Sequence, residues 1–426
     1  MIRSVVYLLL VGAAWGRADA LDPSFAKIPF ERWLTERESS NIRWTAAVSR
    51  PELSFHLRLA ARVVVKVDGK DLEARRADGR LVFLVQITGQ DGARYQDHGS
   101  IELAKLDEKI KSANLEYTQS AFVVPGDYKL AVALLNTGTG EHSVRQTEFR
   151  VTPPQRDLLP GAWKDLPPVE FIPSDEPPEG WYLPGVKGRL RWAAPETRPA
   201  RVNVILNVAL SEADPWSRRT QSSGLAALLP ALKAITHAGG SGVVEHIEVL
   251  DLARRRATFQ QERVEELDWP RLKTALGDAN PAAIDLKSLS ERHHSAQYLV
   301  STVRRVMRAS EESCVVVVLS PPVAFETGED LSPVSLEALP SCRVIYIRYR
   351  GPPRQPVFPL DPMMGGRRRG MRNQPMAREE PRHYVADQLA NTLKPLNAKV
   401  FDVEAPEEMA RAMAEVQKAI LKATGQ

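Results

Sequence analysis

The spacing of apolar positions changes near residue 200, and this change divides the chain into two parts. Before residue 200, short apolar runs such as residues 81–87 are bounded by turn dipeptides, here Asp78-Gly79 and Asp91-Gly92. After residue 200, apolar runs rich in Val and Ile alternate with stretches of helical spacing. Regular turn signals are typical of antiparallel sheets, and the alternation is typical of parallel strands joined by helices. We therefore predict two domains of different fold class.

The first part predicts an antiparallel β-sandwich over residues 51–152. The turn Pro125-Gly126-Asp127, which leads into an apolar strand at Tyr128, resembles turns of immunoglobulin-like and fibronectin-like sandwich domains. Asp68-Gly69 is predicted to form another turn, and the helical spacing of residues 101–112 indicates one helical interruption. The strand signals cover residues 57–67, 81–87, 121–124, 128–135 and 144–151.

The first fifty residues predict an export signal and a lead-in segment. Residues 1–20 combine a basic start, an apolar run and the small-residue pattern Ala18-Asp-Ala20, which predicts a signal peptide cleaved after Ala20. A membrane anchor is the alternative, but the run is shorter than the about 20 residues that a spanning helix needs. We expect an exported protein, periplasmic or extracellular, without a transmembrane segment in the mature chain. The lead-in, residues 21–50, is expected to pack its aromatic side chains on the sandwich.

Residues 153–200 predict a linker between the two domains. The pairs Pro153-Pro154, Pro167-Pro168 and Pro177-Pro178 interrupt any regular element. Tryptophans are rare in loose linkers, so we expect this segment to run over both domains and pack on them, and stacking on a carbohydrate is the alternative. The tryptophans concerned are Trp163, Trp181 and Trp192.

The second part predicts a doubly wound α/β domain over residues 201–426. The apolar run 201–211 opens it as a strand buried on both faces, and we place this strand at the centre of the sheet. Residues 243–252 and 257–262 are joined by a short connection, which predicts a hairpin and therefore one antiparallel edge strand. Further strands are predicted after Cys314, after Cys342 and at 399–403, with helices at 225–235, 268–276, 290–310 and 406–422.

An arginine-rich insertion interrupts this domain at about residues 350–382. It holds eight arginines and three acidic residues, an excess of five that is larger than the net charge of +4 of the whole chain. Its Pro, Gly, Arg and Met composition predicts a disordered segment. The functional alternative is an arm that binds a polyanion, such as an acidic partner, a membrane surface or nucleic acid. Its basic residues would be Arg367, Arg368, Arg369 and Arg372.

Charge and cysteine content narrow the function classes. The chain has 57 Lys and Arg and 53 Asp and Glu, so its weak net charge does not favour a specific nucleic-acid partner. Cys314 and Cys342 stand at the amino ends of two strands that we expect to be neighbours. A disulfide suits an exported protein, and two buried free thiols are the alternative.

The sequence contains no catalytic constellation. The motifs G-x-S-x-G, H-E-x-x-H and C-x-x-C are absent. His293-His294 start a helix, where their rings point about 100° apart and chelate one ion poorly. His246 and Glu248 share one side of a strand and could pair, but we interpret that side as a solvated face. We therefore predict neither an enzyme nor a cofactor.

The element order of residues 198–424 resembles the von Willebrand factor A domain, and the whole chain resembles exported bacterial proteins of that family. The resemblance implies a metal-ion-dependent adhesion site at the carboxyl edge of the sheet, with the signature D-x-S-x-S after the first strand. In the matching stretch, Asn207 stands for the Asp, Ala209 for the first Ser, and Ser211 alone remains. Because Mg²⁺ requires hard oxygen ligands, we expect a degenerate site without a metal. A Rossmann-type domain is the competitor, but the G-x-G-x-x-G fingerprint is missing.

The sequence thus predicts an exported, non-catalytic protein–protein interaction or scaffold protein whose protein partner is unknown. One alternative is a metal-dependent adhesion module with a non-standard ligand set. Another is a hydrolase that acts at the carboxyl edge of the sheet.

Overall fold

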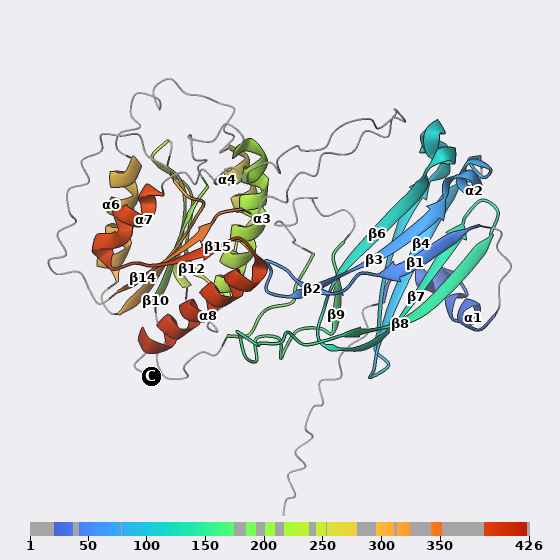
Figure 1. The fold of residues 1–426 in the computed structure, drawn as a ribbon, viewed down its shortest axis with the longest axis horizontal. Helices are drawn as coiled ribbons and strands as arrows, with labels where there is room; N and C mark the ends of the chain where they lie inside the picture. Colours follow the sequence, from blue (N-terminus) through green and yellow to red (C-terminus); the bar gives the residue numbers. More distant parts are fainter. Residues whose placement is uncertain are drawn as a thin grey trace, which may run out of the picture. The chain divides into compact units, whose positions relative to one another are not determined.

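The computed structural model describes residues 21–36, 42–77, 79–173, 185–192, 201–208, 217–237, 244–252, 254–278, 295–310, 313–323, 342–351 and 387–423. The predicted signal peptide and nearly all of the arginine-rich insertion lie outside these residues. The chain divides into two compact units, shown in Figure 1. The first comprises Met1–Glu52, Leu59–Pro153 and Pro167–Ser174, and the second comprises Leu53–Arg58, Pro154–Leu166 and Asp175–Gln426.

The first unit contains two sheets in which every described strand pair is antiparallel. One sheet has the order β1 (Trp44–Val48), β3 (Leu59–Asp68), β6 (Asn114–Val123) and β9 (Val169–Phe171), with β2 (Glu52–Leu53) paired to β3. The other has the order β5 (Arg94–Glu102), β4 (Arg80–Gly89), β7 (Gly126–Asn136) and β8 (His142–Val151).

The two sheets contact each other through apolar side chains. Phe83 on β4 stacks on Tyr117 on β6, with ring centroids 4.2 Å apart. Along β3, alternate residues are buried, as expected for a strand with one core-facing side. By contrast, β4 is buried on both sides over most of its length, which explains its continuous apolar run in the sequence.

The lead-in segment covers the outer side of β4 and β7. It forms a 3-10 turn, η1 (Phe25–Lys27), and a short helix, α1 (Phe30–Thr35). Phe25, Phe30 and Trp33 join one buried cluster with Leu84, Ala131 and Ala133. The prediction that the aromatic residues of the lead-in pack on the following domain is therefore confirmed.

Two local predictions for the first part are wrong, and a third is confirmed in part. Asp68-Gly69 does not form a simple turn, because the Asp68 carboxylate accepts from the Lys70 N–H and caps the short helix α2 (Gly69–Glu73). A Cβ at position 69 would lie 1.8 Å from the Ile110 carbonyl oxygen, so only glycine fits there. The helical interruption predicted at residues 101–112 is present as two 3-10 turns, η2 (Leu103–Lys105) and η3 (Glu108–Ser112), which follow the end of β5 at Glu102. The predicted linker contains a regular element, since β9 pairs with β6.

The linker tryptophans belong to the second unit. The indole N–H of Trp163 donates to the Leu57 carbonyl oxygen at 2.8 Å, and Trp192 is buried. Trp181 lies outside the described residues. Together with β9 in the first unit, these contacts show that the segment contributes to the packing of both units.

The second unit is built on a six-stranded mixed sheet. Its order is β12 (Arg256–Val264), β11 (Val244–Asp251), β10 (Arg201–Asn207), β13 (Cys314–Ser320), β14 (Arg343–Tyr349) and β15 (Lys399–Val403). Only β12 is antiparallel to its neighbour. The predictions of a central opening strand and of one antiparallel edge strand are confirmed. β10 ends at Asn207, four residues earlier than predicted from the apolar run.

Helices cover both faces of this sheet (Figure 1). On one face, α3 (Ser217–Thr236) and α8 (Pro406–Ala423) contact each other and pack on β13 and β14. On the other, α6 (Ser295–Ala309) contacts β13 and α7 (Gln388–Leu393), which continues into the 3-10 turn η5 (Lys394–Leu396). α4 (Trp269–Asp278) packs on β12. The described part of the chain includes no helix of sufficient length and apolarity to span a membrane.

Candidate functional site

The carboxyl edge of the six-stranded sheet is the candidate functional site. The parallel strands β10, β13 and β14 end there at Asn207, Ser320 and Tyr349. From β10 the strand order runs through β11 to β12 on one side and continues with β13, β14 and β15 on the other, so the order reverses between β10 and β13. Sheets of this kind bind ligands outside the carboxyl ends of their strands at such a point.

A buried hydrogen bond joins the ends of β10 and β13. The Asn207 amide Nδ2 donates to Ser320 Oγ at 2.9 Å, and both side chains are fully buried. The Ser320 hydroxyl in turn donates to the Pro321 carbonyl oxygen at 2.6 Å. The position that the resemblance assigns to a metal-binding Asp therefore presents an amide donor to the neighbouring strand. Ala209 and Ser211, the other two positions of the degenerate site, lie outside the described residues.

Tyr346 on β14 lies beside this bond. Its side chain is fully buried, and its hydroxyl donates to the Pro321 carbonyl oxygen at 3.4 Å. Burial raises the pKa of the Tyr346 hydroxyl well above its ordinary value, and the negative charge of Asp387 raises it further. Tyr346 is therefore a neutral donor at physiological pH and cannot serve as a base.

A charged network of Arg348, Arg350, Asp387 and Asp402 forms the rest of the edge. Arg348 donates from one terminal nitrogen to Asp387 Oδ2 at 2.7 Å and from Nε to Asp402 Oδ1 at 2.6 Å. Arg350 Nε donates to the same Asp402 oxygen at 2.8 Å. The network contains two positive and two negative side chains, so its formal charge is zero.

Burial and pairing act in opposite directions on the pKa values of Arg348 and Asp402. Burial lowers the pKa of the Arg348 guanidinium, but the two aspartates outweigh this effect and raise it. Burial raises the pKa of the Asp402 carboxyl, but hydrogen bonds from Arg348 and Arg350 outweigh this effect and lower it. These groups therefore remain charged and paired at neutral pH.

Asp387 also fixes the local backbone. Its Oδ1 accepts from the Leu389 N–H, which caps α7, and from the Val323 N–H after β13, both at 3.2 Å. Its side chain is 4% exposed. Asp387 thus ties β13, β14 and α7 together at the carboxyl edge.

The chemistry of this edge is that of a rigid, paired surface. Ser320 forms hydrogen bonds with Asn207 and with the Pro321 carbonyl oxygen, and neither group is a base that could activate the hydroxyl. The two carboxylates of Asp387 and Asp402 are engaged by arginines rather than opposed across a cleft. Among the described residues, this edge therefore contains paired polar side chains and no nucleophile–base pair.

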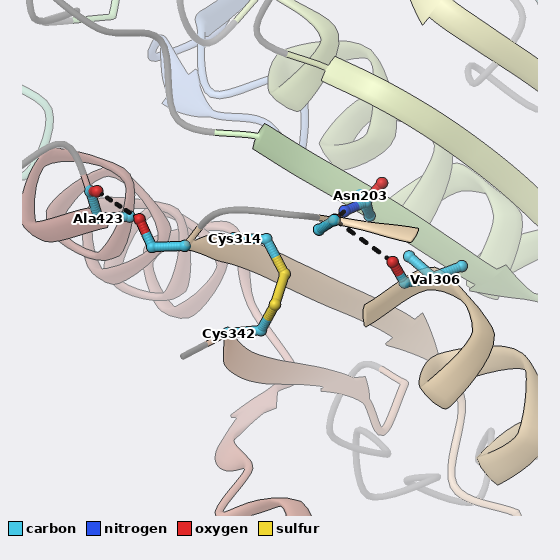
Figure 2. Close-up of a disulfide and its surroundings, with 7 residues drawn as sticks. Asn203, Val306, Cys314, Cys342 and Ala423 are labelled. Carbon is cyan, nitrogen blue, oxygen red and sulfur yellow. Dashed lines mark hydrogen bonds between the residues drawn. A yellow bond between two sulfur atoms is a disulfide. The ribbon is translucent and has the colours of Figure 1, made fainter. Parts of the chain in front are cut away.

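The amino edge of the same sheet is fastened covalently. Figure 2 shows the disulfide that joins Cys314, the first residue of β13, to Cys342, the residue before β14. Of the two alternatives for these cysteines, the structure contains the bridge, with the Cα atoms 4.4 Å apart. Next to it, Ser313 Oγ donates to the Ala423 carbonyl oxygen at 2.7 Å and attaches the end of α8.

The interpretation of His246 and Glu248 as a solvated strand face is wrong. Their side chains do pair, with Nε2 and Oε2 3.2 Å apart, but Glu248 is buried. Arg305 on α6 also donates to Glu248 Oε2, at 2.5 Å, because α6 covers this side of β11. Burial raises the pKa of the Glu248 carboxyl, but hydrogen bonds from His246, Gln260 and Arg305 outweigh burial and lower it.

Several predicted positions fall outside the described residues. These are His293-His294 and the four arginines of the proposed polyanion-binding arm, Arg367, Arg368, Arg369 and Arg372. Conversely, sequence analysis missed the network of Arg348, Asp387 and Asp402. One signal was available, because Arg348 is a charged residue inside an apolar strand run. Its partner Asp387 lies 39 residues away in the sequence, beyond the reach of any local pattern.

No protein-family model matches the chain, and no curated protein matches it. Twenty-four solved protein chains do match. One of them is described as "X-ray structure of Northeast Structural Genomics Consortium target SoR45". The alignment covers 28% of this chain and 94% of that chain, with 15% sequence identity and a TM-score of 0.19. A likeness at that TM-score supports no conclusion about fold or function.

Proposed function

We propose that this chain is an exported, non-catalytic interaction or scaffold protein, with an immunoglobulin-like sandwich followed by a von Willebrand A-like domain that lacks its metal site. The observation that carries the proposal is the buried hydrogen bond between Asn207 and Ser320. It occupies the carboxyl ends of the two central strands, where a metal-dependent adhesion module needs open carboxylate and hydroxyl oxygens.

The topology of the second unit supports the von Willebrand A-like assignment. The opening strand is central, the second strand pairs on its outer side, and the third strand is the antiparallel edge. Helices cover both faces, as in a doubly wound domain. A nucleotide-binding function is not supported, because no Gly-rich loop follows β10 in the sequence.

A tyrosine contact supports the immunoglobulin-like assignment. The Tyr128 hydroxyl, near the start of β7, donates to the Val124 carbonyl oxygen four residues upstream at 2.8 Å. This arrangement is that of the tyrosine corner of immunoglobulin-like sandwiches. The Tyr128 hydroxyl also lies 3.2 Å from the Pro168 carbonyl oxygen, which fastens the segment before β9.

The disulfide supports export. Disulfides persist in oxidising compartments and are rare in the cytosol, so Cys314–Cys342 agrees with the predicted signal peptide. On these grounds we propose that the protein acts in the periplasm or outside the cell. Mass spectrometry of the exported protein is expected to find Leu21 at the amino terminus, and an uncleaved Met1 in the exported protein would contradict this assignment.

A metal titration tests the loss of the adhesion site. Isothermal titration with Mg²⁺, Ca²⁺ and Mn²⁺ is compared between the native chain and the variant Asn207→Ala. We expect no saturable binding that depends on Asn207. Micromolar binding that disappears in Asn207→Ala would overturn the proposal in favour of a metal-dependent module with non-standard ligands.

A photo-crosslinking experiment tests the interaction role. A photoreactive amino acid replaces Arg350 at the carboxyl end of β14, and a matched control replaces Arg343 at the exposed amino end of the same strand. We expect a protein partner to be crosslinked in the exported fraction from position 350 and not from position 343. Equal capture at both positions, or none at either, would contradict docking at this edge.

The arginine-rich insertion is proposed as an accessory arm for an acidic partner. Replacing Arg367, Arg368, Arg369 and Arg372 by serine removes four positive charges. We expect this variant to be crosslinked less than the native chain from position 350. The difference between the two should shrink at high salt, because salt screens the charge contribution. Unchanged capture would assign the insertion no part in binding.

A further inference from the structure

Three potential metal ligands converge in the first unit, independently of the proposed function. Asp22, Asp97 and His98 each offer one ligand atom, and these atoms lie within 4.8 Å of one another. Asp22 comes from the lead-in segment, just before η1, whereas Asp97 and His98 are neighbours on the edge strand β5. Within the part of the chain that the structure describes, no other group of three His, Cys, Asp or Glu side chains converges in this way.

Asp22 and His98 face each other directly. Asp22 Oδ2 lies 2.5 Å from His98 Nδ1, and Asp22 Oδ1 accepts from the Ser24 N–H at 2.8 Å. The backbone thus holds one carboxylate oxygen and leaves the other directed at the imidazole nitrogen. A tetrahedral zinc ion bound to both atoms would separate them to about 3.3 Å, given metal–ligand bonds of about 2.0–2.1 Å. A small rotation of either side chain supplies that change.

Asp97 is oriented by buried neighbours. Its Oδ2 accepts from Gln119 Nε2 at 2.6 Å, and its Oδ1 accepts from the His98 N–H at 2.8 Å. The Gln119 side chain is 1% exposed, and its Oε1 accepts from the Tyr117 hydroxyl at 2.9 Å. Hydrogen bonds of this kind orient ligating carboxylates in metal sites and tune their affinity. Each carboxylate oxygen keeps a second lone pair with which it can bind an ion.

We propose that Asp22, Asp97 and His98 bind a divalent first-row transition metal, with Zn²⁺ as the ion that the ligand set favours. One imidazole nitrogen and two carboxylate oxygens are ligands that zinc accepts, and three protein ligands leave one position for water. With a neutral imidazole, the three side chains carry a formal charge of −2, which the ion balances. The His98 side chain is 42% exposed, so the ion can enter from solvent.

The site would fasten the lead-in segment to the four-stranded sheet. Asp22 stands three residues before Phe25, which belongs to the apolar cluster over β4 and β7. An ion held by Asp22 on one side and by β5 on the other joins these two parts of the unit. Metal binding is therefore expected to stabilise the first unit against unfolding, since a ligand that binds only the folded state raises its stability.

Zinc titration of the chelator-treated full chain, in competition with a chromophoric chelator, tests the proposal. We expect one equivalent of Zn²⁺ to bind at micromolar concentration or tighter, together with a rise in the thermal midpoint. His98→Ala and Asp97→Asn are expected to weaken binding at least tenfold. His142→Ala is the matched control, since His142 is also in the first unit but stacks on Trp33, and it should bind as the native chain does.

Two results would overturn the proposal. The first is no zinc uptake by the native chain at tenfold molar excess, with the fold intact by circular dichroism. The second is equal uptake by the native chain and His98→Ala, which would place the ion elsewhere. Asp22→Asn separates a metal site from a plain hydrogen bond. Its zinc affinity should be lower than that of the native chain. Its thermal midpoint without zinc reports the loss of the Asp22–His98 hydrogen bond alone.

Discussion

The two edges of the six-stranded sheet are held together by different chemistry. At the amino edge, a disulfide joins Cys314 and Cys342. At the carboxyl edge, the Asn207–Ser320 hydrogen bond joins β10 to β13, and the Arg348–Asp387 ion pair joins β14 to the start of α7. The amino edge is therefore closed by a bond that only reduction or exchange breaks, and the carboxyl edge by contacts that a mutation or acid can break.

The difference indicates which edge can have a role in recognition. A covalent closure needs no precise polar geometry around it, whereas each polar group buried at the carboxyl edge requires a matched partner. The carboxyl edge is also where doubly wound sheets bind ligands. A buried amide–hydroxyl pair joins the ends of β10 and β13 at that edge.

The largest effect is expected from Asp387→Ala. This change removes one of the two aspartate partners of the half-buried Arg348 and the acceptor for the Leu389 and Val323 N–H groups. Breaking a buried ion pair on one side typically costs about 3–5 kcal/mol. Urea unfolding should show this loss together with faster hydrogen exchange in α7.

The matched control for this change is Asp165→Ala. Asp165 pairs with Arg191 at 3.1 Å in the same unit, but both side chains are exposed. Its loss should cost less than about 1 kcal/mol. Equal losses in the two variants would show that the carboxyl-edge network contributes no more than a surface ion pair.

Removal of the disulfide is expected to have the next largest effect. The bridge closes a loop with a sequence separation of 28 residues, and the chain-entropy model gives about 3.5 kcal/mol for a loop of that size. Cys314→Ala/Cys342→Ala should unfold at lower urea concentration and should no longer respond to reductant. If the native chain unfolds at the same urea concentration with and without reductant, the covalent amino edge contributes nothing to stability.

Two asparagines on β10 allow the edges to be compared with one residue type. Asn207 donates to Ser320 at 2.9 Å, and Asn203, nearer the amino edge, donates to Ser310 at 3.3 Å. Both are buried. Asn207→Ala should cost about 1–3 kcal/mol because it leaves the Ser320 hydroxyl without that partner. Asn203→Ala should cost less, since its bond is longer, and the reverse order in urea unfolding would contradict the comparison.

The sequence predicted the strands of the second unit that are buried on both faces, and it missed β5, an edge strand with many polar residues. β10, β13 and β14 appear as Val- and Ile-rich runs because both of their sides pack against helices. β5 was missed because its buried positions, such as Tyr95, alternate with polar residues along a short edge strand. Asp97 and His98 lie in that strand, so the proposed metal site was missed with it.

The candidate site was predictable only in part. Asn207 was identified from the sequence because the family resemblance assigns a role to that position. Its partner Ser320 lies 113 residues further along the chain, and only the parallel register of β10 and β13 brings the two together. The pairing of Arg348 with Asp387 and Asp402 likewise depends on how β14, β15 and the start of α7 are arranged. Long-range partners of this kind follow from topology and not from local sequence patterns.

The smallest expected effect separates the two edges by their response to acid. The pKa of the Asp402 carboxyl is lowered in the folded state, where burial opposes and Arg348 and Arg350 favour the charged form. A carboxyl with a lowered folded pKa stabilises the protein above its unfolded pKa of about 3.9, and this contribution disappears as the pH falls through the folded value.

Because Asp402 is half exposed, the effect should stay below about 1 kcal/mol. Asp402→Asn should therefore be slightly less stable than the native chain at pH 7, and this difference should shrink as the pH falls below about 3.9. A stability difference that stays unchanged as the pH falls would show that Asp402 acts through packing and not through its charge.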